Sequence, residues 1–158
     1  YLISAGFDHV LRIWNPVLSQ RLGELRGHND VLVGMFVDNS ERLVTCCSEA
    51  VVKIWDTTNY ICLQTIRAAD MIFSGSGMQG EKEVTAALFV PALSRILIAY
   101  TSSDRVGHVF CLEVDSGASL HIPERGNIIA ATYVATAQKF VTATSNLVRV
   151  WDARDASL

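Results

Sequence analysis

The chain has 158 residues, of which 50% are apolar and 18% are charged, with a formal net charge of −3. This composition excludes a disordered chain, and the lack of a basic excess argues against a nucleic-acid-binding surface. The longest apolar stretch, residues 84–100, is interrupted by Pro91, Ser94 and Arg95 and is too broken to span a bilayer as a helix.

The first residues carry no initiating methionine, basic n-region or cleavage site, so we predict no signal peptide and expect residue 1 to be internal to a longer protein. None of the four cysteines, Cys46, Cys47, Cys62 and Cys111, forms a C-x-x-C pair. We expect free thiols buried in strands and a reducing, cytoplasmic compartment.

A six-residue pattern occurs three times: two positions that are mostly apolar, a basic residue, an apolar residue, Trp, and then Asp or Asn. It reads "VLRIWN" at residues 10–15, "VVKIWD" at 51–56 and "LVRVWD" at 147–152. Between the last two, "GHVFCLEVDSG" at 107–117 has the same shape, with Leu112 at the Trp position. The successive spacings are then 41, 57 and 39 residues. They indicate a repeat of about 40–45 residues, as in propeller blades, with one insertion.

Within the second repeat, short β patterns alternate with turn residues. Residues 42–66 predict three strands separated by turns at 48–50 and 57–59, and another strand with a turn at 38–40 precedes them. No segment has a sustained 3.6-residue apolar period. The chain is therefore predicted to be all-β, as a propeller, barrel or sandwich.

The stretches "LISAGFDHVLRIWN", "LRGHNDVLVGMFVDNSERLVTCCSEAVVKIWD" and "KFVTATSNLVRVWD" resemble the WD40-repeat family, with Gly27-His28 standing 27 residues before Trp55-Asp56. The resemblance implies a β-propeller segment of four-stranded antiparallel blades. We divide the chain into a partial blade (1–28), a blade (29–69), a degenerate blade with an inserted loop (70–124) and a partial blade (125–158). A ring of about seven blades cannot close with this length, so we expect an incomplete ring.

In this family a His, a Ser or Thr, a turn Asp and the Trp form a hydrogen-bonded tetrad. The resemblance assigns these roles to Ser4, Asp8 and Trp14 in the first unit, to His28, Trp55 and either Thr45 or Cys47 in the second, and to Thr142 and Trp151 in the fourth. Glu49 replaces the turn Asp in the second unit and Asn127 replaces the His in the fourth, so the repeats are degenerate.

The residue after each Trp is expected to start a turn, because Asn and Asp side chains bond nearby backbone N–H groups. These residues are Asn15, Asp56 and Asp152. The basic residues Arg12, Lys53 and Arg149 alternate with apolar positions, so we expect them on the solvated side of their strands or shielding a blade edge.

Gly75, Gly77 and Gly80 match G-x-G-x-x-G, but a dinucleotide site needs a helix after the glycines. The β-like segment that follows favours a flexible inserted loop, in which Glu81 and Glu83 beside Lys82 form a solvated cluster. The histidines, including His9, are scattered, which disfavours zinc. We predict no metal, cofactor or catalytic residue.

The resemblance implies a non-enzymatic scaffold for protein–protein interaction, whose partners are other proteins and not nucleic acid, membrane or a small-molecule substrate. We expect two docking elements: the face of the second-to-third-strand turns, and the 70–83 insertion. The candidate partner-binding residues are Phe7, His9, Asp104, Arg105 and Asn146 on the turns, and Lys82 in the insertion. For His9, a structural or solvated role is favoured over partner contact, because lone histidines usually have such a role.

Two further functions stay open. One is an architectural component of a filament or of a ciliary, axonemal or microtubule-associated assembly, which would place the protein on the cytoskeleton or axoneme rather than free in the cytoplasm. The other is a propeller-based enzyme or small-molecule binder whose site lies in other blades. A fold of this kind hosts many functions, so architecture alone cannot decide between them.

Overall fold

A computed structural model describes residues 1–37, 42–74, 83–101, 106–124, 126–155 and 157. The described strands form four antiparallel sheets. The first sheet consists of β1 (Leu2–Ala5), β2 (Leu11–Asn15) and β3 (Gln20–Leu25). The second consists of β4 (Leu32–Val37), β5 (Leu43–Cys47), β6 (Val51–Asp56) and β7 (Ile61–Arg67).

The third sheet consists of β8 (Glu83–Val90), β9 (Arg95–Thr101), β10 (Gly107–Glu113) and β11 (Ser119–Glu124). The fourth consists of β12 (Ile128–Val134), β13 (Lys139–Thr144) and β14 (Val148–Asp152). Within every sheet, strands adjacent in the chain are adjacent in space, so each sheet is a meander of hairpins.

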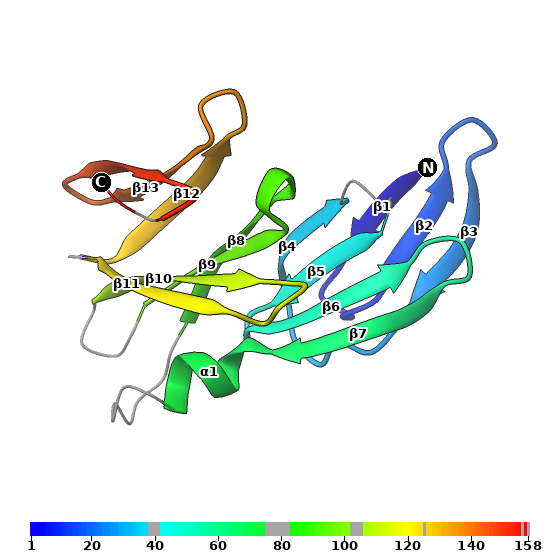
Figure 1. Cartoon of the computed structure of the whole chain (residues 1–158). Coiled ribbons are helices and arrows are strands. Elements are labelled where there is room, and N and C mark those ends of the chain that lie inside the picture. Colours follow the sequence, from blue (N-terminus) through cyan, green and yellow to red (C-terminus); the bar gives the residue numbers. More distant parts are fainter. Residues whose placement is uncertain (38–41, 75–82, 102–105, 125, 156, 158) are drawn as a thin grey trace.

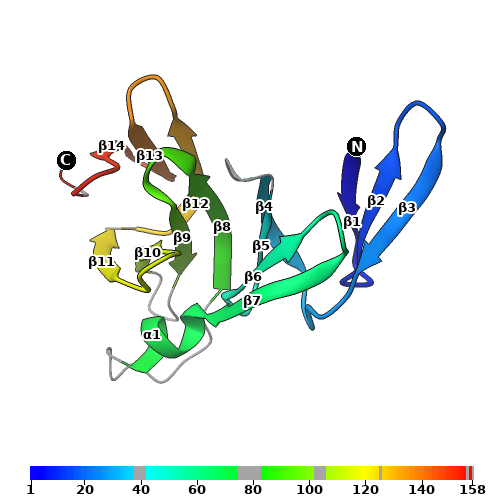
Figure 2. The same cartoon turned by 45° about the vertical axis from the view of Figure 1, so that its right-hand side comes forward.

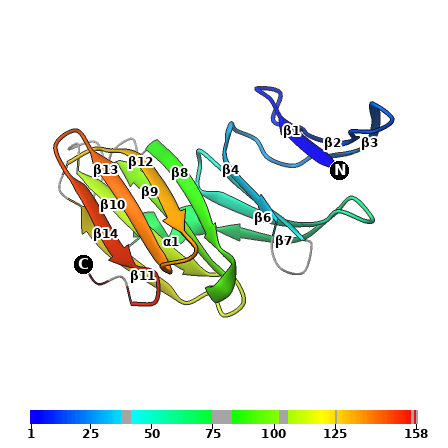
Figure 3. The ribbon, with the colours of Figure 1, turned by 90° about the horizontal axis from the view of Figure 1, so that it is seen from above.

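The sheets stand side by side in chain order, and β8 lies between β4 and β12 (Figures 1 and 2). Figure 3 shows the blue first sheet at one end of the array and the orange and red fourth sheet at the other. The array does not close on itself. The prediction of an all-β, incomplete propeller is thus confirmed.

The hydrophobic core is divided among the interfaces between consecutive sheets. Leu11, Ile13 and Leu25 of the first sheet pack with Leu43 and Trp55 of the second. A larger cluster joins the second sheet to the third, and another joins the third to the fourth. Each sheet is therefore stabilised mainly by its neighbours, as in other repeat architectures.

The first strands of the second, third and fourth sheets share an irregularity that the sequence does not reveal. In each one the pairing with the next strand shifts register, which is typical of a β-bulge. The shift falls between Leu32 and Gly34, between Val84 and Ala86, and between Ile128 and Ala130. The three sheets therefore share this backbone feature although their side chains at these positions differ.

The turns after the Trp-bearing strands are fixed by side chains, as predicted. Asn15 Oδ1 accepts hydrogen bonds from the N–H groups of Val17 (2.9 Å) and Leu18 (3.1 Å). Asp56 and Asp152 accept equivalent bonds in the second and fourth sheets, from Thr58 (2.7 Å) and Arg154 (2.9 Å). These turn expectations are confirmed.

The inserted segment differs from the loop that the sequence predicts, because it begins as a short helix, α1 (Ala68–Ser74). Ala68 and Ile72 are buried in the cluster between the second and third sheets. Their four-residue spacing places them on one helix face, but two anchors are too few to give a visible apolar period. Gly75, Gly77, Gly80, Glu81 and Lys82 lie outside the described residues.

A turn of 3₁₀ helix, η1 (Pro91–Leu93), leads from β8 to β9. It ends at Ser94, which has φ 47° in the left-handed region and donates its N–H to Pro91 O. Among the described residues, no helix is long and apolar enough to cross a membrane.

All four cysteines are free. Cys46, Cys47 and Cys111 are buried, and burial raises the pKa of the Cys46 thiol to about 12. The expectation of burial is wrong for Cys62, which is exposed because it lies on the outer strand β7.

Candidate functional site

Three sheets place a tryptophan against a hydroxyl on the neighbouring strand. The indole Nε1–H donates to Ser4 Oγ from Trp14 (2.8 Å), to Thr45 Oγ1 from Trp55 (2.8 Å) and to Thr142 Oγ1 from Trp151 (2.9 Å). In each sheet the hydroxyl residue pairs with the basic residue two positions before the Trp, so the bond runs diagonally across the strands. These bonds satisfy indole donors that packing removes from water.

The second sheet adds a histidine to this pair. His28 Nε2 lies 2.7 Å from Thr45 Oγ1, and the His28 and Trp55 ring centroids are 6.1 Å apart. The Thr45 hydroxyl donates to Lys53 O (3.4 Å) and accepts from Trp55, so the imidazole must donate through Nε2–H. This leaves Nδ1 as an acceptor, and it has no hydrogen-bond partner.

His28 is 6% exposed, and its burial, aided by the charge of Lys53, lowers its pKa to about 4. The imidazole is therefore neutral at physiological pH. Glu49 occupies the turn position that Asp8 has in the first sheet, and its residue is exposed. His28, Thr45 and Trp55 thus form a three-membered cluster.

The third sheet has replaced this cluster by apolar side chains. Leu112 pairs with Ile96 as Trp55 pairs with Leu43, and Phe110 pairs with Ile98 as Lys53 pairs with Thr45. The positions of the hydroxyl, the base and the tryptophan therefore hold Ile98, Phe110 and Leu112, all buried. Because this sheet lacks both the Trp donor and its hydroxyl acceptor, neither group is buried without a hydrogen-bond partner.

In the fourth sheet, Asn127 stands where the repeat would have its histidine. Its Oδ1 accepts a hydrogen bond from Thr101 Oγ1 of the third sheet at 2.6 Å. Trp151 and Phe140 stack with centroids 5.8 Å apart. The Asn127 bond therefore joins the third and fourth sheets.

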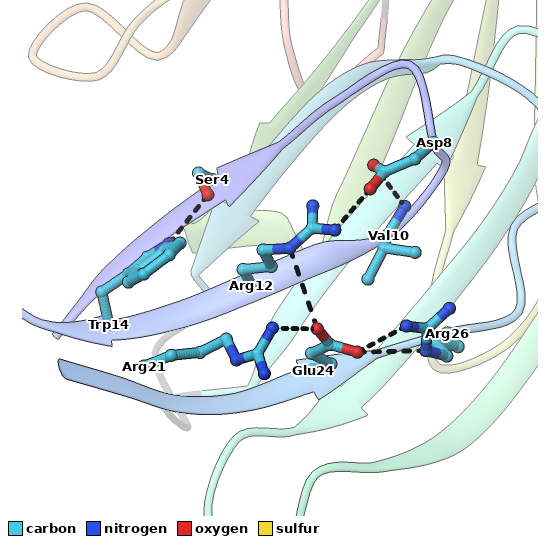
Figure 4. A network of polar contacts seen from close by, with 8 residues as sticks. All are labelled: Ser4, Asp8, Val10, Arg12, Trp14, Arg21, Glu24 and Arg26. Atoms are coloured by element: carbon cyan, nitrogen blue, oxygen red, sulfur yellow. Dashed lines mark hydrogen bonds and ion pairs between the residues drawn. The ribbon is translucent and has the colours of Figure 1, made fainter.

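Figure 4 shows the charged network of the first sheet, which lies at the β1–β2 turn and on β2 and β3. Asp8 Oδ2 accepts from Arg12 Nη2 at 2.5 Å, and Arg12 Nε lies 3.8 Å from Glu24 Oε1. Glu24 also pairs with Arg21 (2.6 Å) and Arg26 (2.7 Å). The bond from Arg12 holds the pKa of Asp8 low, and that from Arg26 does the same for the pKa of Glu24.

The sequence assigned Asp8 to a tetrad, but its carboxylate contacts Arg12 and the N–H of Val10 (3.4 Å). The network therefore links the β1–β2 turn to the next two strands. Phe7, at the tip of this turn, is 88% exposed. His9 follows it with φ 60° in the left-handed region and is only half-buried.

The other predicted partner-binding residues are more dispersed. Asn146 is exposed on the β13–β14 turn, so the second and third sheets separate it from Phe7 and His9 (Figure 1). Asp104, Arg105 and Lys82 lie outside the described residues. The described part of the candidate surface is thus a single turn with Phe7 and His9, together with a distant Asn146.

No group of three or more His, Cys, Asp or Glu side chains that could hold a metal occurs in the described part of the chain. His108 is buried and stacks on Tyr100, with centroids 5.0 Å apart. Its surroundings are those of a core side chain.

Sequence reasoning missed two charged features. The network around Glu24 had a signal in "RLGELR", residues 21–26, because Glu24 on β3 lies two residues before Arg26, which directly follows the strand. The second feature, Arg95, donates to the carbonyl oxygens of Ala153 (3.2 Å) and Arg154. These partners are 58 and 59 residues away, and no local pattern predicts them.

A family model described as "WD domain, G-beta repeat" matches residues 19–56. The chain carries a WD40 repeat. The matched residues run from β3 through β6, which are the last strand of the first sheet and the first three strands of the second. Because the repeat straddles two sheets, it links consecutive blades covalently, and the array is a segment of a WD40 propeller.

The curated proteins that resemble the chain include the following three. The "WD repeat-containing protein 89 homolog" of Dictyostelium discoideum is 36% identical over 74 residues, which is 46% of this chain and 21% of that protein. The human "Kinesin-like protein KIF21B" is 24% identical over 76% of this chain and 9% of that protein. The "Cilia- and flagella-associated protein 337 B" of Tetrahymena thermophila is 22% identical over 96% of this chain and 11% of that protein.

The chain thus spans between about a tenth and a fifth of the length of these relatives. WD40 repeats generally act as scaffolds for protein–protein interaction.

Proposed function

We propose that this segment is a docking platform for partner proteins, and that the β1–β2 turn is its first point of contact. The observation that carries this proposal is Phe7, whose side chain is 88% exposed at the tip of the turn. A large aromatic side chain in water is a natural anchor, because it buries much apolar area at a small entropic cost when a partner covers it.

The Asp8–Arg12 contact supports the same proposal. The carboxylate accepts from Arg12 Nη2 (2.5 Å) and from the N–H of Val10 (3.4 Å), which ties the turn to β2 immediately after Phe7. Loops held by a rigid scaffold are favoured recognition elements. A pre-ordered turn also loses less conformational freedom on binding.

The test is a comparison of Phe7→Ala with Val17→Ala in the intact protein. Val17 is 87% exposed on the β2–β3 turn, so each variant truncates a highly exposed apolar side chain, at opposite ends of β2. We expect partners purified with the protein to be lost from Phe7→Ala and retained by Val17→Ala, with both variants folded. Equal retention by both variants would exclude the turn as the docking element.

The inserted segment is the second proposed docking element. Ile72 anchors α1 in the core, while Met71 is exposed beside it. Methionine suits such a surface because its flexible, polarizable side chain adapts to a partner. Met71→Ala tests the helix, with Ile72 left in place to keep it docked. Unchanged binding in Met71→Ala would remove the described part of the insertion from the platform.

A second candidate function is an architectural role in a filament or a ciliary assembly, with localisation on the cytoskeleton or axoneme. It is favoured by the similarity to a cilia- and flagella-associated protein along 96% of the chain and to a kinesin-like protein along 76%. Cross-linking mass spectrometry of the intact protein from its own cells separates the two functions. Tubulin or axonemal cross-links would support the architectural role, and cross-links to non-filament partners alone would support the cytoplasmic scaffold.

A further inference from the structure

A pocket of about 160 Å³ lies where the third and fourth sheets meet, away from the β1–β2 turn. The third sheet supplies most of its lining, and the segment after β14 supplies one residue. The residues that matter below are Arg95, Cys111, Glu113, Ser119, Leu120 and Arg154. Two guanidinium groups from different sheets therefore share one pocket.

Contacts across the sheet interface hold Arg95, and contacts within the fourth sheet hold Arg154. Arg95 Nη1 donates to the carbonyl oxygens of Ala153 (3.2 Å) and Arg154. The Nε and Nη2 groups of Arg154 donate to Gln138 Oε1 at 3.1 and 2.6 Å. Planar guanidinium groups fixed in this way are pre-organised for an oxyanion, since little side-chain freedom is left to lose.

These contacts do not use all the N–H donors of Arg95 and Arg154. A guanidinium carries five N–H bonds. Within the described residues, Nε and Nη2 of Arg95 and Nη1 of Arg154 make no hydrogen bond, and neither arginine forms an ion pair. The pocket thus holds unused, charged donors on two neighbouring side chains.

The neighbouring carboxylates accept hydrogen bonds from groups other than the two guanidinium groups. Glu113 lines the pocket, but its Oε2 accepts from Ser116 Oγ at 2.6 Å. Asp152 and Asp155 flank Arg154 in the sequence, and each accepts from a backbone N–H, of Arg154 (2.9 Å) and Ser157 (3.0 Å). Glu113 pairs with Arg95 across the strands and keeps its charge, but two guanidinium groups against this one carboxylate leave the lining with a net positive charge.

The rest of the lining limits what can enter. Leu120 is 45% exposed and gives an apolar wall, while Ser119 offers a hydroxyl. A volume of about 160 Å³ is that of roughly five water molecules, which suits one short side chain better than a nucleotide. An oxyanion on an aliphatic stem matches the charged donors and the wall together.

We propose that this pocket binds one acidic side chain of a partner peptide, either the carboxylate of Asp or Glu or the phosphate of phosphoserine. The proposal deepens the proposed function and rests on it, since the peptide belongs to a docked protein. The shared chemistry is an oxyanion that accepts hydrogen bonds from both arginines, which are the side chains best suited to carboxylate and phosphate.

The experiment uses the intact protein and photo-cross-linking peptides of the form acetyl-Gly-X-Gly-amide. X is Glu, phosphoserine or Gln, a diazirine is placed beside it, and cross-links are mapped by mass spectrometry. We expect Glu or phosphoserine peptides, or both, to label Ser119 or Leu120, and the Gln peptide to fail. The acidic residue that labels more strongly identifies which oxyanion the pocket prefers.

Two variants and one control complete the test. Arg154→Ala removes one guanidinium, and Ala118→Glu places a competing carboxylate at the exposed edge of the pocket, so each should lower labelling of Ser119 and Leu120 about tenfold or more. Arg67→Ala removes an exposed arginine from β7 of the second sheet and should leave labelling unchanged. Equal labelling by the Gln peptide, or equal losses in Arg154→Ala and Arg67→Ala, would overturn the proposal.

The last measurement tests whether inorganic phosphate binds to the pocket and competes with the acidic peptides. Competition by phosphate against a labelling acidic peptide supports the shared oxyanion chemistry. Binding of phosphate with no labelling by either acidic peptide would overturn the assignment to a partner protein. Labelling of Leu120 reports on the pocket alone, whereas partner retention in Phe7→Ala reports on the platform, so failure of one is distinguishable from failure of the other.

Discussion

Trp55 and Thr45 are joined by a 2.8 Å hydrogen bond from the indole Nε1–H to the threonine hydroxyl, and both residues are almost completely buried. The same hydroxyl lies 2.7 Å from His28 Nε2 and 3.4 Å from Lys53 O. One oxygen atom therefore connects the strand β5 to β6 and to the segment that precedes β4. Its removal tests how far the second sheet depends on polar contacts inside an apolar interface.

Thr45→Val should lower the free energy of unfolding by about 2 kcal/mol, because the shape is kept while the donors of Trp55 and His28 lose their acceptor. Urea denaturation of the intact protein measures the loss. Thr65→Val is the matched control, since Thr65 is exposed on β7 and its hydroxyl contacts only the side chains of Lys53 and Cys62. A loss as large for Thr65→Val would contradict this account.

In the third sheet we expect Val to give a more stable protein than Thr, which is the opposite of the order expected at position 45. Ile98 occupies the position of Thr45, among buried apolar neighbours that include Phe110 and Leu112. Ile98→Thr should therefore be less stable than Ile98→Val by about 1–3 kcal/mol, because the hydroxyl is buried without a matching Trp donor. The Val and Thr variants are nearly equal in shape, so their difference isolates the hydroxyl. Equal unfolding midpoints would mean that the hydroxyl finds a partner in this sheet.

The sequence predicted the sheets better than the contacts at their edges. The recurring Trp and the spacing of Leu112 fix the blades, because a strand that packs between two sheets must keep its apolar positions in register. The sequence did not predict the helix α1, because only two buried residues, Ala68 and Ile72, dock it and they are too few to show a helical period. The carboxylate of Asp8 was assigned to a tetrad by resemblance, but it accepts from Arg12 and from the N–H of Val10.

Contacts between sheets lie beyond local patterns for a simple reason. Arg95 and Arg154 are 59 residues apart, and their approach depends on the twist and spacing of two complete sheets. Alternation along a strand tells which face a side chain occupies, but not which loop of the next blade faces it. The candidate residues Asp104, Arg105 and Lys82 stay predictions, because they lie outside the described residues.

At Gly34 the second sheet lies close against the third. A Cβ at this position would lie 2.8 Å from both Cβ and O of Ala87, and 3.0 Å from the ring of Phe36. Gly34→Ala should lower the free energy of unfolding by about 1–3 kcal/mol, because the backbone carbonyl of β8 cannot move aside without disturbing its own pairing. Thermal or urea unfolding of the intact protein measures the effect.

The double variant Gly34→Ala with Ala87→Gly is the informative control. It removes one of the two clashes with Ala87 and keeps the one with its carbonyl oxygen, so stability should recover only in part. Full recovery would place the whole penalty on the Cβ–Cβ contact. No recovery, together with an unaltered Ala87→Gly single variant, would place it on the backbone approach alone.

The imidazole of His28 makes stability depend on pH. Burial first, and the charge of Lys53 second, lower its pKa in the folded protein to about 4, while an unfolded chain has the ordinary value of 6.5. Between these two values the unfolded state binds the proton and the folded state does not. The free energy of unfolding should therefore be at its full value above about pH 6.5 and should fall as the pH drops towards 4.

His28→Asn separates this effect from that of the carboxylates. Asn keeps a side-chain donor near Thr45 and does not titrate, whereas Asp8, Glu24 and Asp30, with pKa values held low by their partners, act in both proteins and at lower pH. Urea midpoints measured from pH 4 to 7.5 should slope less in His28→Asn than in the unaltered protein. Identical slopes would mean that His28 takes up its proton in the folded state, and that the cluster with Thr45 and Trp55 opens to water at acidic pH.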